Sequence, residues 1–185
     1  YRKVTDTFQL QVAMHERVLG VEREGDGAAA VFAVSTRNRL GVERVREARA
    51  VVLAMGYYDR PNRLGVPGED LPHVSHYYSE PHPHYRRRVL VVGGKNSACE
   101  AALDLYRNGA HVTLVHRGAT LGDSVKYWVR PDVENRIKEG SITAHFETRV
   151  VEIRPTGVVV ETAGETHEIA ADDVLLLTGY RADPA

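Results

Sequence analysis

The stretch VLVVGGKNSA, residues 89–98, decides the fold of this chain. Its first four residues, 89–92, are apolar and predict a buried strand. The glycines that follow, Gly93 and Gly94, predict a tight turn, and the next residues predict a helix that runs to Gly109. A strand, a glycine turn and a helix in this order direct backbone N–H groups at a pyrophosphate. The stretch therefore predicts a dinucleotide-binding turn.

This motif departs from the usual G-x-G-x-x-G/A pattern at one position. Gly93 and Ala98 fill the first and third places, but Lys95 stands where the second glycine normally lets a phosphate approach the backbone. The Lys95 ammonium group can instead contact the phosphate, and an ordinary strand–helix turn is the alternative interpretation. The flanking sequence favours the dinucleotide. The helix has one apolar face, Gly109 suits its C-terminal end, and residues 111–115 predict a strand that completes a right-handed βαβ unit.

The end of that second strand indicates which dinucleotide is bound. NAD-binding domains place an acidic residue there to hold the ribose 2′-OH. This chain has His116 and Arg117 instead, with no acid before Asp123. A carboxylate would repel a 2′-phosphate, whereas Arg117 can hold it through two parallel hydrogen bonds. The sequence therefore predicts NADP(H), with Lys126 as a further candidate for the same phosphate. The alternative is that Arg117 is an ordinary solvated residue.

Composition narrows the class of function. The chain has 185 residues, 43% hydrophobic and 26% charged, which suits a core with a hydrated surface in one large or two small domains. A net charge of −1 argues against nucleic acid or an anionic membrane as the main partner, and no apolar run has membrane-spanning length. The single cysteine, Cys99, excludes a disulfide framework and predicts a cytoplasmic location.

The sequence also contains an internal repeat. Residues 50–61, AVVLAMGYYDRP, and residues 173–184, DVLLLTGYRADP, each predict an apolar strand that ends in a Gly-Tyr turn. The second copy has a βαβ front half at residues 88–117, and the first copy lacks one. We therefore expect a fragment whose first glycine motif lies before Tyr1. Three short antiparallel strands are predicted before each copy, at 18–23, 30–35 and 42–48, and at 149–154, 158–162 and 166–170.

Two tandem dinucleotide domains, each with a meander before its last strand, form the two-nucleotide flavoprotein pattern. The chain resembles the FAD-dependent pyridine nucleotide-disulfide oxidoreductases of the thioredoxin-reductase-like type, and within them the bacillithiol-disulfide reductase (YpdA-type) group. Its most specific stretches are residues 93–142 and residues 54–72, AMGYYDRPNRLGVPGEDLP. The resemblance implies an α/β fold. Residues 86–185 would be a Rossmann-like NAD(P)-binding domain with an inserted antiparallel β-meander, and residues 1–85 part of a homologous FAD-binding domain with a linker.

The resemblance also implies a function and a set of site residues. It implies an oxidoreductase that uses NADP(H) and FAD to reduce a low-molecular-weight disulfide such as bacillithiol disulfide, commonly as a homodimer. The fragment itself would hold no catalytic residue and no metal, and would be inactive. The implied NADP(H) contacts are Gly93, Gly94, Asn96, Ser97 and Ala98 at the pyrophosphate, His116 and Arg117 at the 2′-phosphate, and Thr178 and Gly179 near the nicotinamide. The implied FAD contacts are Arg17, Val18, Ala54, Met55 and Gly56, with Met55 in place of the usual Thr.

Other residues are weaker candidates for chemistry. A plain strand-to-loop turn is the alternative for both Gly-Tyr turns. Thioredoxin reductases carry a CxxC dithiol whose positions here fall on His76 and Ser79, so the redox cysteine is expected upstream of Tyr1. Cys99 lies on the alanine-rich helix and is expected to be a small buried hydrophobic group. Four histidines can bind metals, but they alternate with prolines and predict a linker: His73, His76, His82 and His84.

A second helix is predicted after the βαβ unit. Asp123 is expected to cap a packing helix that contains Trp128 and Val129, restarts at Pro131 and ends at Gly140. Two other functions stay open at this point. One is a flavin-dependent monooxygenase, which shares the tandem layout, and the other is a non-enzymatic NADP-binding module.

Overall fold

A computed structural model describes residues 1–182, and the chain divides into two compact units, the first at Tyr1–Met55 and the second from Gly56 onward. The segment that follows Gly56 belongs to the second unit, because its strand β5 (Val74–Ser75) pairs with β12 (Asp173–Leu176). The assignment of residues 1–85 to FAD and 86–185 to NAD(P) stays a prediction.

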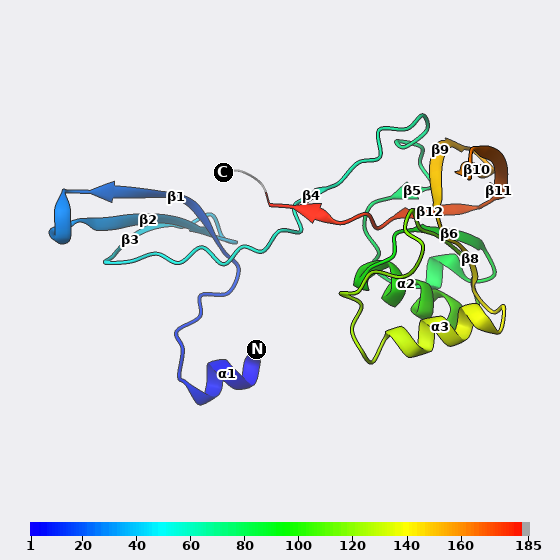
Figure 1. Ribbon diagram of the computed structural model, residues 1–185. Helices are drawn as coiled ribbons and strands as arrows, with labels where there is room; N and C mark the ends of the chain where they lie inside the picture. Colours follow the sequence, from blue (N-terminus) through cyan, green and yellow to red (C-terminus); the bar gives the residue numbers. More distant parts are fainter. Residues whose placement is uncertain (183–185) are drawn as a thin grey trace. The chain divides into compact units, whose positions relative to one another are not determined.

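The first unit is a short helix followed by an antiparallel meander of order β1-β2-β3 (Figure 1). The outer strands are joined across the middle one. Glu16 accepts hydrogen bonds from Arg46 at 2.5 Å and from Thr36 at 2.6 Å. The three strands predicted here are confirmed within a few residues. The elements are α1 (Arg2–Thr7), β1 (Glu16–Glu24), the 3-10 helix η1 (Gly27–Ala29), β2 (Val31–Asn38) and β3 (Glu43–Ala48).

The prediction of a strand at the end of the first repeat copy is wrong. Residues 50–55 form no strand, and the side chains of Val52, Leu53 and Met55 are exposed. No strand of the described chain pairs with this segment, so its backbone groups have no ladder to join. The same pattern in the second copy does form β12, because β12 lies between two parallel partners. The last two residues of that copy, Asp183 and Pro184, lie outside the described residues.

The second unit is built on a five-stranded parallel sheet of order β5-β12-β6-β7-β8 (Figure 1). The predicted βαβ unit is confirmed as β6 (Arg88–Val92), α2 (Asn96–Arg107) and β7 (His111–Val115). Gly109, with φ of +85°, follows the helix, and a Cβ there would lie 2.9 Å from the Tyr85 ring. Two strands of this sheet were not predicted, because a segment of two or three residues is too short to show a periodic pattern: β5 and β8 (Thr143–His145).

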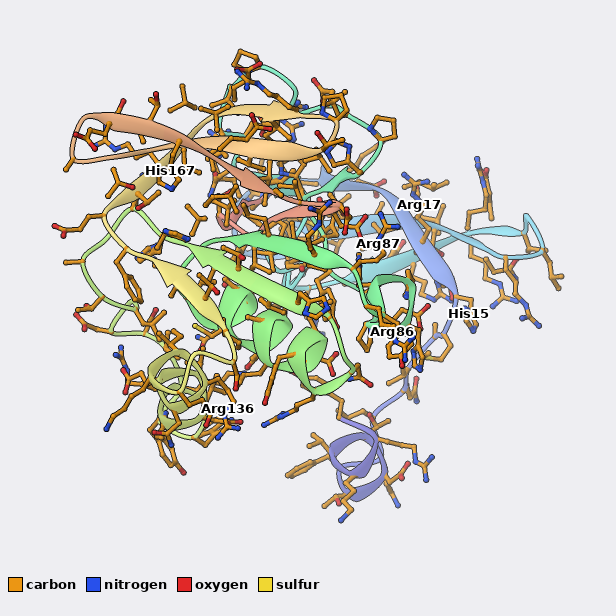
Figure 2. All side chains as sticks on the ribbon, turned by 90° about the vertical axis from the view of Figure 1, so that its right-hand side faces the viewer. His15, Arg17, Arg86, Arg87, Arg136 and His167 are labelled. Atoms are coloured by element: carbon orange, nitrogen blue, oxygen red, sulfur yellow. The ribbon has the colours of Figure 1, made fainter. Side chains whose placement is uncertain are left out.

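Each face of this sheet carries its own core, because successive side chains of a strand point to opposite faces. Val89 and Val91 pack against α2, whereas Leu90 and Val92 pack under an antiparallel meander. Figure 2 shows the sheet between this meander and the helices. The three meander strands match the predicted ones. They are β9 (Thr148–Arg154), β10 (Gly157–Thr162) and β11 (Glu165–Ala170).

The second predicted helix is shorter than expected. α3 spans Arg130–Lys138, and Val129 is its N-cap, so the predicted helical turn through Trp128 and Val129, capped by Asp123, is wrong. The physical reason is Pro131, since proline is tolerated only in the first turn of a helix. The Arg130 guanidinium holds the preceding turns in place by donating a 2.7 Å hydrogen bond to the Gly122 carbonyl oxygen. The helix ends before Gly140, as expected.

The histidine-rich segment before β6 is tied to the second unit by separate contacts. His84, in the 3-10 helix η2 (His82–His84), lies 2.8 Å from Asp173, and His73 lies 3.1 Å from the Arg154 carbonyl oxygen. Among residues 1–182, no group of three His, Cys, Asp or Glu side chains is arranged to hold a metal ion. A two-stranded antiparallel ribbon completes the unit, formed by β4 (Arg60–Pro61) and β13 (Tyr180–Arg181).

Candidate functional site

The turn between β6 and α2 has no space for side chains. Gly93 has φ of +149°, and a Cβ there would lie 2.6 Å from the Leu177 carbonyl oxygen and 2.8 Å from the Ala98 Cβ. A Cβ on Gly94 would lie 2.5 Å from the ring of His116. Both glycines and the small Ala98 are therefore required for β6, α2 and the end of β12 to meet.

The start of α2 presents backbone donors to this turn. The first helical hydrogen bond runs from the Cys99 N–H to the Lys95 carbonyl oxygen at 3.0 Å. The N–H groups of Asn96, Ser97 and Ala98 have no acceptor within the described residues. Unsatisfied N–H groups at a helix start attract anions, and the helix dipole adds to that attraction. The turn at Gly93 and Gly94 leaves a space that a side chain would fill, and unpaired backbone N–H groups line it. This arrangement fits a pyrophosphate.

Basic side chains gather at the neighbouring end of β7. The His116 ring packs against Gly94 and against Gly118, where a Cβ would lie 2.8 Å from its Nε2 atom. Burial lowers the pKa of His116, and the positive charges of Arg117 and Lys95 lower it further. Arg117 is exposed and has no ion pair within the part of the chain that the structure describes. The predicted 2′-phosphate residues thus lie beside the glycine turn, with Arg117 open to a ligand.

The loop after β7 is fastened onto the start of α2. The Asn96 side chain donates to the Ser124 carbonyl oxygen at 2.9 Å and accepts from the Lys126 N–H at 2.8 Å. The Gly122 N–H donates to the Gly94 carbonyl oxygen at 2.8 Å. This use of Asn96 was not predicted, because its partners lie about thirty residues away in the sequence.

Lys126 is brought to the site but has a partner of its own. Its Nζ atom lies 2.7 Å from an oxygen of Glu100, one turn into α2, and 5.7 Å from the centre of the Trp128 ring. An open groove of about 520 Å³ runs along this side of α2. Carboxylates outnumber cations in its lining, so the groove does not suit a phosphate. The charged lining residues are Glu100, Asp104, Arg107 and Asp132.

The turn at Thr178 and Gly179 reaches the same edge of the sheet. The Leu177 N–H donates to the Val92 carbonyl oxygen at 2.8 Å, which places this turn next to Gly93. The Thr178 hydroxyl donates to the Asn62 carbonyl oxygen at 2.5 Å, and the Asn62 N–H donates to the Gly179 carbonyl oxygen at 2.9 Å. The structure thus brings together all the residues predicted to contact NADP(H).

The residues predicted for FAD form no comparable cradle. Arg17 and Val18 lie on β1, where both side chains are exposed (Figure 2 labels Arg17). Ala54 and Met55 lie in the exposed segment after β3, and Gly56, with φ of +74°, begins the second unit. No hydrogen bond in the described chain joins these two groups. Their role in FAD binding stays a prediction.

Cys99 offers no reactive thiol. Its side chain is fully buried in the core under α2, and burial raises the pKa of the thiol to about 11. A thiol that stays protonated near pH 7 is a poor nucleophile. The described helices also include none that is long and apolar enough to cross a membrane.

Comparisons with known proteins agree with this geometry. Residues 1–184 match the family described as Pyridine nucleotide-disulphide oxidoreductase. The chain belongs to this family. It is 44% identical over 133 residues to the Bacilliredoxin reductase Bdr of Bacillus subtilis (strain 168), which covers 71% of this chain and 41% of that protein.

Two solved structures resemble this pyridine nucleotide-disulphide oxidoreductase chain over nearly its whole length. The Bacillithiol Disulfide Reductase Bdr (YpdA) from Bacillus cereus has a TM-score of 0.81 and 40% identity, covering 97% of this chain and 54% of that one. The one from Staphylococcus aureus has a TM-score of 0.82 and 36% identity, covering 98% and 54%. The chain therefore spans about half the length of the relatives it matches.

Proposed function

We propose that this chain supplies the pyridine-nucleotide site of a flavin-dependent reductase that uses NADPH to reduce a low-molecular-weight disulfide of the bacillithiol type. Three free N–H groups at the start of α2, beside Gly93 and the open Arg117, carry this proposal. The similarity to bacillithiol disulfide reductases supports the substrate class. We also infer a cytoplasmic enzyme, homodimeric in full length, with residues 86–185 as the NAD(P) domain and 1–85 as part of the FAD domain.

NADPH and FAD supply the hydride chemistry when bound, and the residues of this chain bind and orient them. The N–H groups of Asn96, Ser97 and Ala98 would hold the pyrophosphate without rearrangement, because nothing in the described chain competes for them. Thr178 and Gly179 would place the nicotinamide end, since their turn is fixed to Asn62 and adjoins Gly93. Of the predicted FAD residues, Arg17 and Val18 would contribute backbone groups, and residues 54–56 an open segment.

The proposal is tested by turnover of the full-length protein. We expect a yellow protein that oxidises NADPH only when bacillithiol disulfide is present. Arg117→Ala should raise the KM for NADPH about tenfold or more while leaving the KM for NADH nearly unchanged, because only NADPH carries the phosphate that Arg117 would hold in a charge-assisted hydrogen bond.

Other outcomes would contradict the proposal. Rapid NADPH oxidation with peroxide release and no need for a disulfide would instead indicate a monooxygenase. A colourless protein that does not take up FAD would indicate a binding module. If Arg117→Ala raised the KM for NADPH and the KM for NADH equally, Arg117 would not be the residue that binds the 2′-phosphate.

A further inference from the structure

Lys95, which stands in the position of the motif's missing glycine, runs along the loop after β7. A Cβ on Gly122 would lie 3.2 Å from the Lys95 Cγ atom and 3.9 Å from its Cε atom. Gly122 is itself held against the turn by its hydrogen bond to the Gly94 carbonyl oxygen. The aliphatic part of the Lys95 side chain therefore packs over Gly122, which has no side chain, and the loop after β7 fixes the direction in which the Lys95 side chain runs.

The charge of Lys95 is not neutralised. Its ammonium group has no ion pair or hydrogen bond to any described residue, and the same holds for the Arg117 guanidinium. The positive charges of both side chains add to burial in lowering the pKa of His116, whose ring packs against Gly94, the neighbour of Lys95, and against Gly118, the neighbour of Arg117. Two unpaired cations beside a half-buried imidazole form an anion site without a protein counter-charge.

The second lysine of this region differs in this respect. Lys126 pairs with Glu100 at 2.7 Å and contacts the Trp128 ring, so its charge is already partly compensated. To bind a phosphate, Lys126 would have to give up its ion pair with Glu100. Lys95 could bind a phosphate without losing an ion pair to any described residue.

We propose that Lys95 joins Arg117 in binding the 2′-phosphate and is a specificity-determining residue for NADPH over NADH. The inference rests on the proposed nucleotide site and assigns one residue within it. A side chain at this motif position would ordinarily obstruct the pyrophosphate, but the stem of Lys95 passes over Gly122. The ammonium group then supplies the point charge that a phosphate attracts, beside the planar fork of Arg117.

The test measures binding of NADP⁺ and NAD⁺, which differ by the 2′-phosphate, to the full-length protein by titration calorimetry. We expect Lys95→Ala to weaken NADP⁺ about tenfold and to leave NAD⁺ within about twofold, as for loss of one charged hydrogen bond. Lys95→Arg should retain most of the preference because it keeps the charge. Lys126→Ala is measured alongside, and Lys138→Ala, at an exposed position in the last turn of α3, is the control and should change neither affinity by more than about twofold.

The outcomes separate this inference from the proposed function. Wild-type protein that binds neither nucleotide would overturn both. If Arg117→Ala loses NADP⁺ selectively while Lys95→Ala does not, the site stands and the role of Lys95 is wrong. Equal losses of NADP⁺ and NAD⁺ in Lys95→Ala, with an unchanged melting temperature, would also reject it. A larger loss of NADP⁺ affinity in Lys126→Ala than in Lys95→Ala would assign the phosphate contact to Lys126.

Discussion

At Gly93, a hydrogen atom in place of a methyl group decides whether β6 can turn into α2. The carbonyl oxygen of Leu177 lies on one side and the Cβ of Ala98 on the other, both closer than a Cβ tolerates. Neither neighbour can move easily, because Leu177 belongs to the backbone that follows β12 and Ala98 is buried in the helix. Gly93 is therefore required for the packing of β6, α2 and the segment after β12, whether or not a ligand is bound.

We expect Gly93→Ala to lower the free energy of unfolding by about 2 kcal/mol or more, since backbone strain and a backbone clash add together. Urea denaturation of the full-length protein measures this loss. Gly20→Ala is the control, because a Cβ there meets nothing within 4 Å. Equal stability of the two variants would mean that the turn is looser than described.

Among the elements, α2 organises the site because it fixes the loop that follows β7. The Asn96 side chain donates one hydrogen bond to that loop and accepts another from it, and together with the ion pair of Glu100 with Lys126 these hold the loop to the first turns of the helix. The geometry of the loop beside the proposed phosphate site is thus set by the same residues whose backbone N–H groups would face the phosphate. Asn96 serves both tasks, one through its side chain and one through its backbone.

Asn96→Ala should therefore release the loop without unfolding the helix. Each lost hydrogen bond contributes about 1 kcal/mol, so amide exchange at Lys126 should become faster by about tenfold or more. Hydrogen–deuterium exchange resolved by residue measures this change. Asn108→Ala is the matched control, because the side chain of Asn108, the C-cap residue of α2, hydrogen-bonds to Asp104 and not to the loop after β7. Unchanged exchange at Lys126 would contradict the fastening role of Asn96.

Elements were predictable from the sequence where the pattern itself is decisive. The apolar residues 89–92, the two glycines and the alanine face of α2 are each enough to indicate their conformation, and all are confirmed. Residues 50–54 carry an equally apolar pattern and form no strand, because a strand needs hydrogen-bonded neighbours as well as apolar side chains. Contacts between distant segments, such as that of Asn96 with Ser124, produce no periodic pattern in the sequence and could not be predicted from it.

Across the molecule, stability should depend on two histidines of the second unit. Burial lowers the pKa of both His116 and His145, and the charge of His167 lowers that of His145 further. A base with a lowered pKa binds fewer protons when folded than when unfolded. Its stabilising contribution is present above the ordinary histidine pKa of about 6.5 and is lost as the pH falls through the folded value.

We therefore expect the melting temperature of the full-length protein to fall between pH 7.5 and pH 5.5. Aspartates such as Asp172, whose pKa is lowered by hydrogen bonds from Arg88, lose their contribution only in stronger acid. His145→Gln should reduce the pH dependence of the melting temperature, because it removes a group whose pKa is lowered by burial. A melting temperature that stays constant or rises on acidification would contradict this assignment.

The pairing of β4 with β13 brings residues about 120 positions apart in the sequence side by side. Tyr180 is opposite Pro61, so the first and last strands of the second unit are neighbours. A unit with adjacent entry and exit can be inserted into a host polypeptide without stretching either connection. Residues 60–181 therefore have the end-to-end geometry of a unit that tolerates insertion into another chain.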